Sequence, residues 1–127
     1  MQRPSLDQLA AERYVSLVTF RRNGKGVPTP IWIAQVGDNL YAFTDGTSAK
    51  MKRLKVNDRV QIAACDARGN LRGEFAEGRA RRVDDPAVID RALAALTQKY
   101  GWQMSVLNVF SRLFGRIERR AYIEISL

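Results

Sequence analysis

The segment LYAFTDGTSAKMKRLK, residues 40–55, combines a turn, a helix-capping residue and a cluster of cations. Its alternating start predicts a short strand with one buried face, which Asp45-Gly46 ends. Thr47 or Ser48 can cap a following helix, whose cations are Lys50, Lys52, Arg53 and Lys55. The unpaired N–H groups and the dipole of a helix start favour an anion, and a phosphate fits there. The alternative is an ordinary capped surface helix with a solvated basic face.

Two residue counts limit the chemistry that the side chains can perform. The sequence has no histidine, which excludes Ser-His and Cys-His pairs and a histidine-ligated metal. Its one cysteine, Cys65, excludes an internal disulfide and lies in an apolar run, which indicates a core position. We therefore predict no catalytic side chain and no metal site. If the protein is an enzyme, a bound cofactor supplies the chemistry.

The net charge of +8 and the pI of about 10.3 predict an anionic partner. Nucleic acid, an acidic membrane surface, and a phosphorylated or polycarboxylate ligand all satisfy this prediction. No run approaches the ~20 apolar residues of a membrane span. Residues 1–10 lack the apolar stretch of a signal peptide, so we expect a cytoplasmic protein with no membrane contact.

Short alternating runs, separated by Gly, Asn and Asp, predict a chain made mainly of strands. Strands are expected over residues 14–21, 27–36, 40–44, 59–65, 71–83 and 120–126, and helices begin near residues 5, 48, 85 and 103. This pattern indicates one mainly β (α+β) domain over residues 1–127, a small closed or partly open barrel.

Pro28 and Pro30 make the second predicted strand unusual. They lie two residues apart, so their missing N–H groups fall on the same edge of the strand. Thr29 and Ile31 keep their donors on the other edge. The unpaired edge can either admit a ligand to the backbone or belong to a plain edge strand that proline protects.

Several short motifs occur in a specific order along the chain. They are T-P-I-W at 29–32, F-T at 43–44, S-A-K at 48–50, R-L at 53–54, E-G-R-A-R-R-V at 77–83 and K-Y-G-W-Q at 99–103. Together they resemble the pyridoxamine 5′-phosphate oxidase-like superfamily, and the last two resemble its F-420-dependent oxidoreductase branch. The resemblance covers nearly the whole chain. It implies a six-stranded antiparallel split β-barrel, FMN-binding-like, with flanking helices, that binds FMN or the deazaflavin coenzyme F-420.

The resemblance also implies a cofactor site, in which Lys50 would hold the cofactor phosphate as the lysine of the family's S-x-K does. The implied set is Thr29, Pro30, Ile31, Trp32, Phe43, Thr44, Ser48, Ala49, Lys50 and Lys52. Ser48 and Thr44 would hydrogen-bond the phosphate or the sugar-alcohol chain, and the backbone of residues 29–31, with Trp32, would border the ring. Two departures argue against pyridoxamine phosphate oxidation itself: residues 27–33 hold no basic residue, and the chain has no histidine for the substrate phosphate.

The resemblance leaves F-420 and FMN open as cofactors of an oxidoreductase that transfers hydride to or from an unidentified small molecule. F-420 is favoured because it adds a glutamate tail, which a basic groove would bind. Such a groove could be formed by Lys50, Lys52, Arg53, Lys55, Arg79, Arg81 and Arg82, or these cations form solvated faces. Family members are usually homodimers with the cofactor between subunits, and the apolar residues 103–114 would form part of the interface.

Two alternatives involve no flavin. A non-enzymatic basic barrel could bind nucleic acid, but this function needs aromatic side chains on the charged face. The aromatic residues of the strands, Tyr14, Phe20, Tyr41, Phe43 and Tyr122, lie among apolar neighbours, which indicates core positions. A haem- or bilin-binding family member is the other alternative, and the missing histidine removes the commonest haem ligand.

Overall fold

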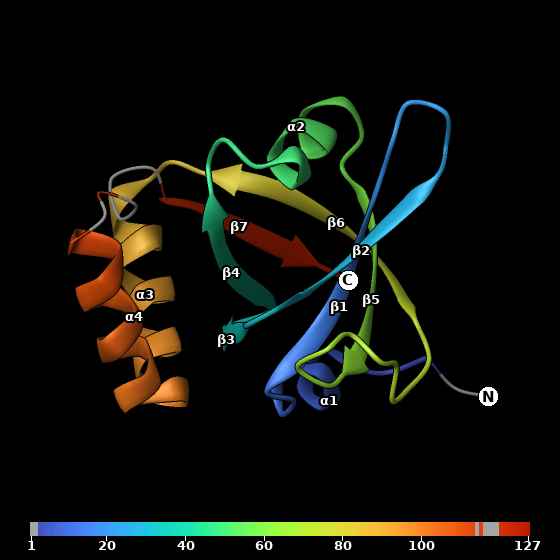
Figure 1. Ribbon diagram of the computed structural model, residues 1–127. Coiled ribbons are helices and arrows are strands. Elements are labelled where there is room, and N and C mark those ends of the chain that lie inside the picture. Colours follow the sequence, from blue (N-terminus) through green and yellow to red (C-terminus); the bar gives the residue numbers. More distant parts are fainter. Residues whose placement is uncertain (1–2, 114, 116–119) are drawn as a thin grey trace.

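Short strands separated by tight turns form one antiparallel sheet, which curls around an apolar interior (Figure 1). The computed structural model describes residues 3–113, 115 and 120–127. The strands are β1 (Tyr14–Phe20), β2 (Gly26–Ile31), β3 (Ala34–Val36), β4 (Asn39–Asp45), β5 (Arg59–Cys65), β6 (Ala76–Val83) and β7 (Arg120–Ser126). The helices are α1 (Leu6–Ala10), α2 (Ala49–Val56), α3 (Pro86–Tyr100) and α4 (Trp102–Leu113). The mainly β fold with flanking helices is therefore confirmed.

The strand order corrects the predicted six-stranded barrel. The described sheet has seven strands in the order β2-β1-β5-β6-β7-β4-β3, so β2 and β3 are its edges and no hydrogen-bonded ladder closes it. The strand predicted over residues 27–36 is two strands, of which β2 pairs with β1 and β3 pairs with β4. Pro28 and Pro30 lie on β2, as expected of an edge strand. Only Trp32 and Ile33 separate β2 from β3, so the covalent chain links the two edges.

Side chains from the end of α3 replace the missing strand partners at this break. The Ile33 N–H donates to the Tyr100 hydroxyl at 3.1 Å, and the Ile33 carbonyl accepts from Lys99 Nζ at 2.7 Å. The Tyr100 hydroxyl in turn donates to the Arg13 carbonyl at 2.7 Å. Because Ile33 is fully buried, its backbone polar groups require such partners. Lys99 and Tyr100, from the K-Y-G-W-Q motif, therefore stabilise the backbone at Ile33, where the chain passes from the edge strand β2 to the edge strand β3.

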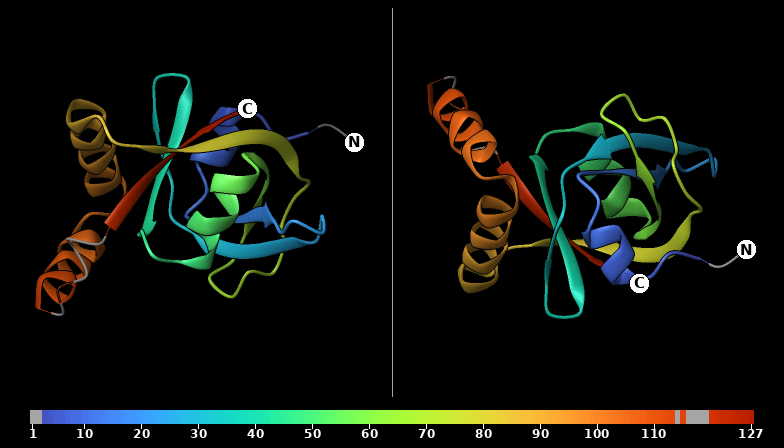
Figure 2. Two further views of the ribbon diagram at one scale, coloured as in Figure 1. Left: turned by 90° about the horizontal axis from the view of Figure 1, so that it is seen from above. Right: turned by 90° about the horizontal axis from the view of Figure 1, so that it is seen from below.

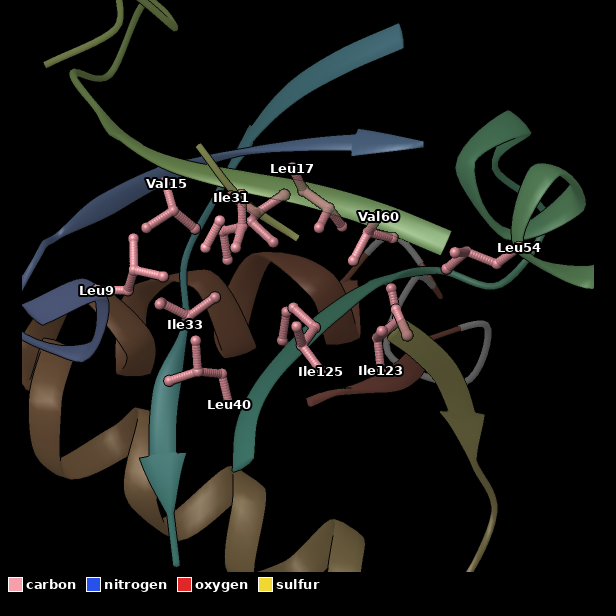
Figure 3. Close-up of a cluster of buried hydrophobic side chains, with 14 of the residues drawn as sticks. Leu9, Val15, Leu17, Ile31, Ile33, Leu40, Leu54, Val60, Ile123 and Ile125 are labelled. Carbon is pink, nitrogen blue, oxygen red and sulfur yellow. The ribbon is translucent and has the colours of Figure 1, made fainter. Parts of the chain in front are cut away.

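The main hydrophobic core fills the interior of the curled sheet (Figure 3). Inward-facing residues alternate along the strands, as with the fully buried Val15 and Leu17 of β1. Leu9 of α1 and Leu54 of α2 extend this core toward its two ends. Figure 2 shows α2 and α1 lying over opposite ends of the sheet. The interior is thus packed with side chains, and a ligand must bind at its surface.

A second apolar layer lies outside the sheet, where α3 packs against β3 and β4, and α4 packs against α3 (Figure 1). Leu96, Tyr100 and Met104 are buried there with Ala34. Gly101, at φ +59°, ends α3 and lets the chain reverse into α4. None of the described helices is long and apolar enough to cross a membrane.

Candidate functional site

The turn between β4 and α2 is fixed by hydrogen bonds within the turn. The Asp45 carboxylate accepts from the N–H and the hydroxyl of Thr47, at 2.8 and 2.6 Å. The Ser48 N–H donates to the Asp45 carbonyl at 3.0 Å. The Ser48 hydroxyl caps the helix by accepting from the Met51 N–H at 3.4 Å. The N–H groups of the first helical residues, Ala49 and Lys50, have no partner within the helix and remain available for an acceptor.

Lys50 is the cation closest to this helix start, and it is half-buried. Its Nζ donates to Thr44 Oγ1 at 3.1 Å, and it has no carboxylate partner within the described part of the chain. Burial, and then the charge of Arg53, lower the pKa of Lys50. A charge that is held in place, partly desolvated and not neutralised is an attractive partner for an incoming anion.

The other cations assigned to a basic groove divide into two groups. Three lie on β6 and are already paired: Arg79 with Asp58, Arg81 with Glu124 and Arg82 with Asp84. Lys52 and Lys55 of α2 are exposed, and Arg53 of the same helix donates through Nε to Thr19 Oγ1 at 2.6 Å. The unneutralised charge therefore lies on α2, and β6 does not continue the groove.

The site residues predicted on and after β2 belong to other elements than the start of α2. Pro30 is exposed, and Ile31 is buried in the main core. The Trp32 indole stacks on the Tyr100 ring, with centroids 4.3 Å apart and an interplanar angle of 8°. Trp32 and Phe43 pack against the same apolar cluster between the sheet and the helices. Phe43 immediately precedes Thr44 on β4, so it is the residue that connects this cluster to the α2 start.

Thr29 is the remaining predicted residue of β2, and it is half-buried opposite Leu17 of β1. No hydrogen bond joins it to the Ser48–Lys50 segment among the residues described. Phe43, Thr44, Ser48, Ala49 and Lys50 lie on one stretch from β4 into α2, and Thr29 and Pro30 lie on the edge strand β2.

Arg120, which no sequence motif singles out, lies opposite Asp45 in the register of β7 and β4. Its guanidinium covers the Phe43 ring at 4.3 Å and donates to Asn108 Oδ1 and to the buried Ser111 Oγ, at 3.0 and 3.2 Å. Beside these contacts lies a small pocket of about 150 Å³, open to the surface and lined by Phe43, Thr44, Asp45, Leu107, Ser111 and Arg120. Only the strand order, with β7 beside β4, could have placed Arg120 here.

No group of three or more potential metal ligands lies together among residues 3–113, 115 and 120–127. The cysteine is buried, and burial raises the pKa of the Cys65 thiol. A thiol in that state is a weak nucleophile. The arrangement at the α2 start is thus suited to binding an anion rather than to acid–base, nucleophilic or metal chemistry.

Comparisons with known proteins agree with this fold. The family model described as "Pyridoxamine 5'-phosphate oxidase" matches residues 4–125 of the chain. No curated protein matches it. Among solved structures, the conserved hypothetical protein Rv2991 from Mycobacterium tuberculosis has a TM-score of 0.69 at 21% identity, covering 93% of this chain and 74% of that chain.

Two further solved structures carry names that mention a cofactor. HutZ, the heme storage protein from Vibrio cholerae, has a TM-score of 0.69 at 11% identity, covering 91% of this chain and 82% of its own. An FAD-binding protein from Mesorhizobium loti has a TM-score of 0.63 at 18% identity, covering 94% of this chain and 82% of its own. At these identities, the likeness shows the fold alone.

Proposed function

The chain belongs to the pyridoxamine 5′-phosphate oxidase family, and on this premise we propose that it is an oxidoreductase that binds coenzyme F-420 or FMN. The observation that carries the proposal is the unneutralised Lys50, held against Thr44 beside the capped start of α2. When bound, the deazaflavin or flavin supplies hydride transfer to or from a small molecule. The residues of the chain bind and orient the cofactor.

The donor set at the α2 start fits a phosphate. Lys50 Nζ offers a positive charge with N–H donors, and the first helical N–H groups, of Ala49 and Lys50, add directional donors. The Thr44 hydroxyl accepts from Lys50 and can donate its own proton to a phosphate or sugar-alcohol oxygen. The Asp45 carboxylate, which would repel a phosphate, is bonded to Thr47 within the turn.

Between the two cofactors, we expect F-420 with a long tail to bind more tightly than FMN. Both place a phosphate at the α2 start, so this contact does not discriminate between them. Only the glutamate tail reaches the exposed Lys52 and the partly exposed Arg53. Each exposed ion pair contributes ~0.2–1 kcal/mol to the binding free energy, and several pairs together shift the affinity by about an order of magnitude.

Fluorescence titrations with F-420 and with FMN, at low and high salt, test this preference. Because salt screens exposed charges within ~8 Å at physiological ionic strength, the advantage of the long tail should shrink as salt rises. Tighter binding of FMN, or an F-420 affinity that ignores both salt and tail length, would replace the F-420 proposal with the FMN alternative.

The two alternatives without a flavin gain less support from the structure. Phe20, Tyr41 and Tyr122 are at most 8% exposed, so they offer no stacking surface to nucleic acid bases. The likeness to HutZ concerns the fold, and this chain has no histidine to bind haem iron. The absorbance spectrum of the protein, after incubation with each cofactor and removal of the excess, separates the three functions: a deazaflavin or flavin band, a haem band, or no band.

We also propose that the protein is a homodimer that uses the outer face of α4. Exposed apolar side chains form one stripe along this helix: Trp102, Val106, Val109, Phe110 and Leu113. Four residues of α4, Ser105, Val106, Val109 and Phe110, also line a shallow apolar hollow that is open to the surface. Phe114, the last residue of the predicted interface, lies outside the described residues.

Sedimentation at micromolar concentration tests the dimer. The wild-type protein should sediment as a dimer, and Val109→Glu should shift it toward monomer, because the variant buries an unpaired charge in the interface. Leu71→Glu is the matched control, since Leu71 and Val109 are 53% and 58% exposed and Leu71 lies between β5 and β6, where it forms a β-bridge with Cys65. A monomeric wild-type protein would contradict the proposal.

A further inference from the structure

Neutralised and unneutralised cations lie on different elements of the molecule. The ion pairs of the described residues all engage arginines of β5 and β6: Arg59, Arg79, Arg81 and Arg82. In contrast, no carboxylate of the described residues pairs with Arg21 or Arg22 of the β1–β2 hairpin, or with Lys52 or Arg53 of α2. Arg21, Arg22, Lys52 and Arg53 are thus among the cations of the described residues that no carboxylate neutralises.

These four cations line a single cavity of about 320 Å³. The remaining lining residues are Phe20 and Val56, so the wall combines an aromatic ring, an aliphatic side chain and four positive charges without a carboxylate. The hairpin and α2 lie at the same end of the sheet (Figure 1). The volume falls at the lower end of the range of ligand pockets, ~300–1,000 Å³.

Hydrogen bonds position the backbone of Arg21 and the side chain of Arg53 at this cavity. The Arg21 N–H donates to the Lys25 carbonyl at 2.9 Å, and the Gly24 N–H donates to the Arg21 carbonyl at 2.8 Å, which fixes the hairpin. Arg53 is anchored through its Nε to Thr19, which leaves its terminal Nη groups for another acceptor. Burial, and then the charge of Arg21, lower the pKa of Arg53. A bound anion would relieve this repulsion.

Arg53 relates the cavity to the α2 start. Arg53 follows Lys50 by three residues, so the two side chains lie on the same face of the helix, one turn apart. The charge of Arg53 contributes to the lowered pKa of Lys50, as expected for close neighbours. From Lys50, a chain of cations leads over Arg53 to Arg21 and Arg22. A ligand whose phosphate lies at the α2 start can extend along this chain.

We propose that this cavity is a second anion-binding site, which binds the carboxylates of the F-420 tail. The inference rests on the proposed function, in which the cofactor phosphate binds at the start of α2. The tail leads toward the β1–β2 hairpin and not toward β6, because the arginines of β6 already have carboxylate partners. Arg21 and Arg22, which no motif singles out, are thereby assigned a role in tail binding.

The test compares two double variants that remove the same charge from different surfaces. Arg21→Gln with Arg22→Gln changes the cavity, and Arg79→Gln with Arg82→Gln changes the paired arginines of β6. Each protein is titrated by fluorescence at low salt with F-420 carrying one glutamate and with F-420 carrying several. The hairpin variant should lose about fivefold to thirtyfold in affinity for the long-tailed form. Its affinity for the short-tailed form, and both affinities of the β6 variant, should change by less than about twofold.

A second titration separates this inference from the proposed function. A γ-linked glutamate oligomer without deazaflavin is titrated calorimetrically into the same proteins. If the wild-type protein binds the oligomer and only the hairpin variant loses it, the cavity is an anion site even where F-420 itself does not bind. If F-420 binds but the hairpin variant keeps its full affinity for the long tail, the second site is refuted and the proposed function stands. Equal behaviour of the two variants in both titrations also overturns the inference.

Discussion

Lys50→Ala is expected to weaken F-420 or FMN binding by about tenfold to a hundredfold, because a charge-assisted contact to a phosphate contributes ~1.5–3 kcal/mol. Lys50 lies in the first turn of α2, where its Nζ is held against Thr44 and has no carboxylate partner among the described residues. Its burial lowers the pKa, so part of the cost of holding this charge is already present before the anion binds. The phosphate therefore meets a preorganised cation.

Lys55→Ala is the matched control for this effect. It removes the same charge from the same helix, but Lys55 is exposed and lies in the last turn. We expect its loss to change cofactor affinity by no more than about threefold. Fluorescence titration of the wild type and both variants measures the difference, and circular dichroism checks that each remains folded. Equal losses in the two variants would contradict the assignment of the phosphate to the α2 start.

Tyr100→Phe is expected to lower the free energy of unfolding by about 1–3 kcal/mol, since it leaves the buried Ile33 N–H without a partner. The substitution keeps the ring that stacks on Trp32 and removes only the hydroxyl that bonds to Ile33 and Arg13. Ile33 is fully buried, so no water can replace this partner without rearrangement. Urea unfolding measures the loss.

The effect of Tyr100 should also depend on pH. Burial raises the pKa of Tyr100 to about 12 from its ordinary value of 10.0. The folded protein therefore keeps the phenol proton that the unfolded chain releases above pH 10, so the contribution to stability is fully present below pH 10 and is lost as pH rises toward 12. The difference between wild type and Tyr100→Phe should narrow over this range. A constant difference would indicate that the hydroxyl is not buried and bonded as described.

Tyr14→Phe is the control for the tyrosine experiment. Tyr14 is half-buried at the start of β1, and its hydroxyl makes no hydrogen bond within residues 3–113, 115 and 120–127. Its replacement should change the free energy of unfolding by less than about 0.5 kcal/mol. If Tyr14→Phe and Tyr100→Phe destabilise the protein equally, the break between β2 and β3 does not depend on the Tyr100 hydroxyl.

Local signals in the sequence predicted most of the strands and helix starts. The strands expected over residues 59–65 and 120–126 agree with β5 and β7. Ser48 caps α2 and Gly101 ends α3, as expected, because caps depend on residues within one turn of the chain. The site at the α2 start could be proposed from sequence for the same reason, since its turn, its cap and its cation lie within six residues.

The break at Trp32 and Ile33 could not be predicted from local pattern. Residues 27–36 read as one strand, and Pro28 and Pro30 indicated only an unpaired edge. The partners that stabilise the break, Lys99 and Tyr100, come from the end of α3. Because these side chains lie 66 and 67 residues from Ile33, the alternation of apolar and polar residues within 27–36 does not reveal the break between β2 and β3.

Which surface cations have a carboxylate partner could not be predicted from the sequence. The basic stretch of β6 suggested a free cationic groove, but Arg81 pairs with Glu124, its neighbour in the register of β6 and β7. Such pairing depends on strand order, which the sequence does not reveal. The opposite holds for Arg21 and Arg22, which look like ordinary hairpin residues until the fold places them beside α2.

A crystal structure of the protein saturated with F-420 would show whether the cofactor phosphate binds at the start of α2. We expect the phosphate oxygens to lie within hydrogen-bonding distance of Lys50 Nζ and of the N–H groups at the start of α2, with Ser48 beside them. A phosphate bound at any other part of the molecule, while this helix start keeps its present contacts, would contradict the account.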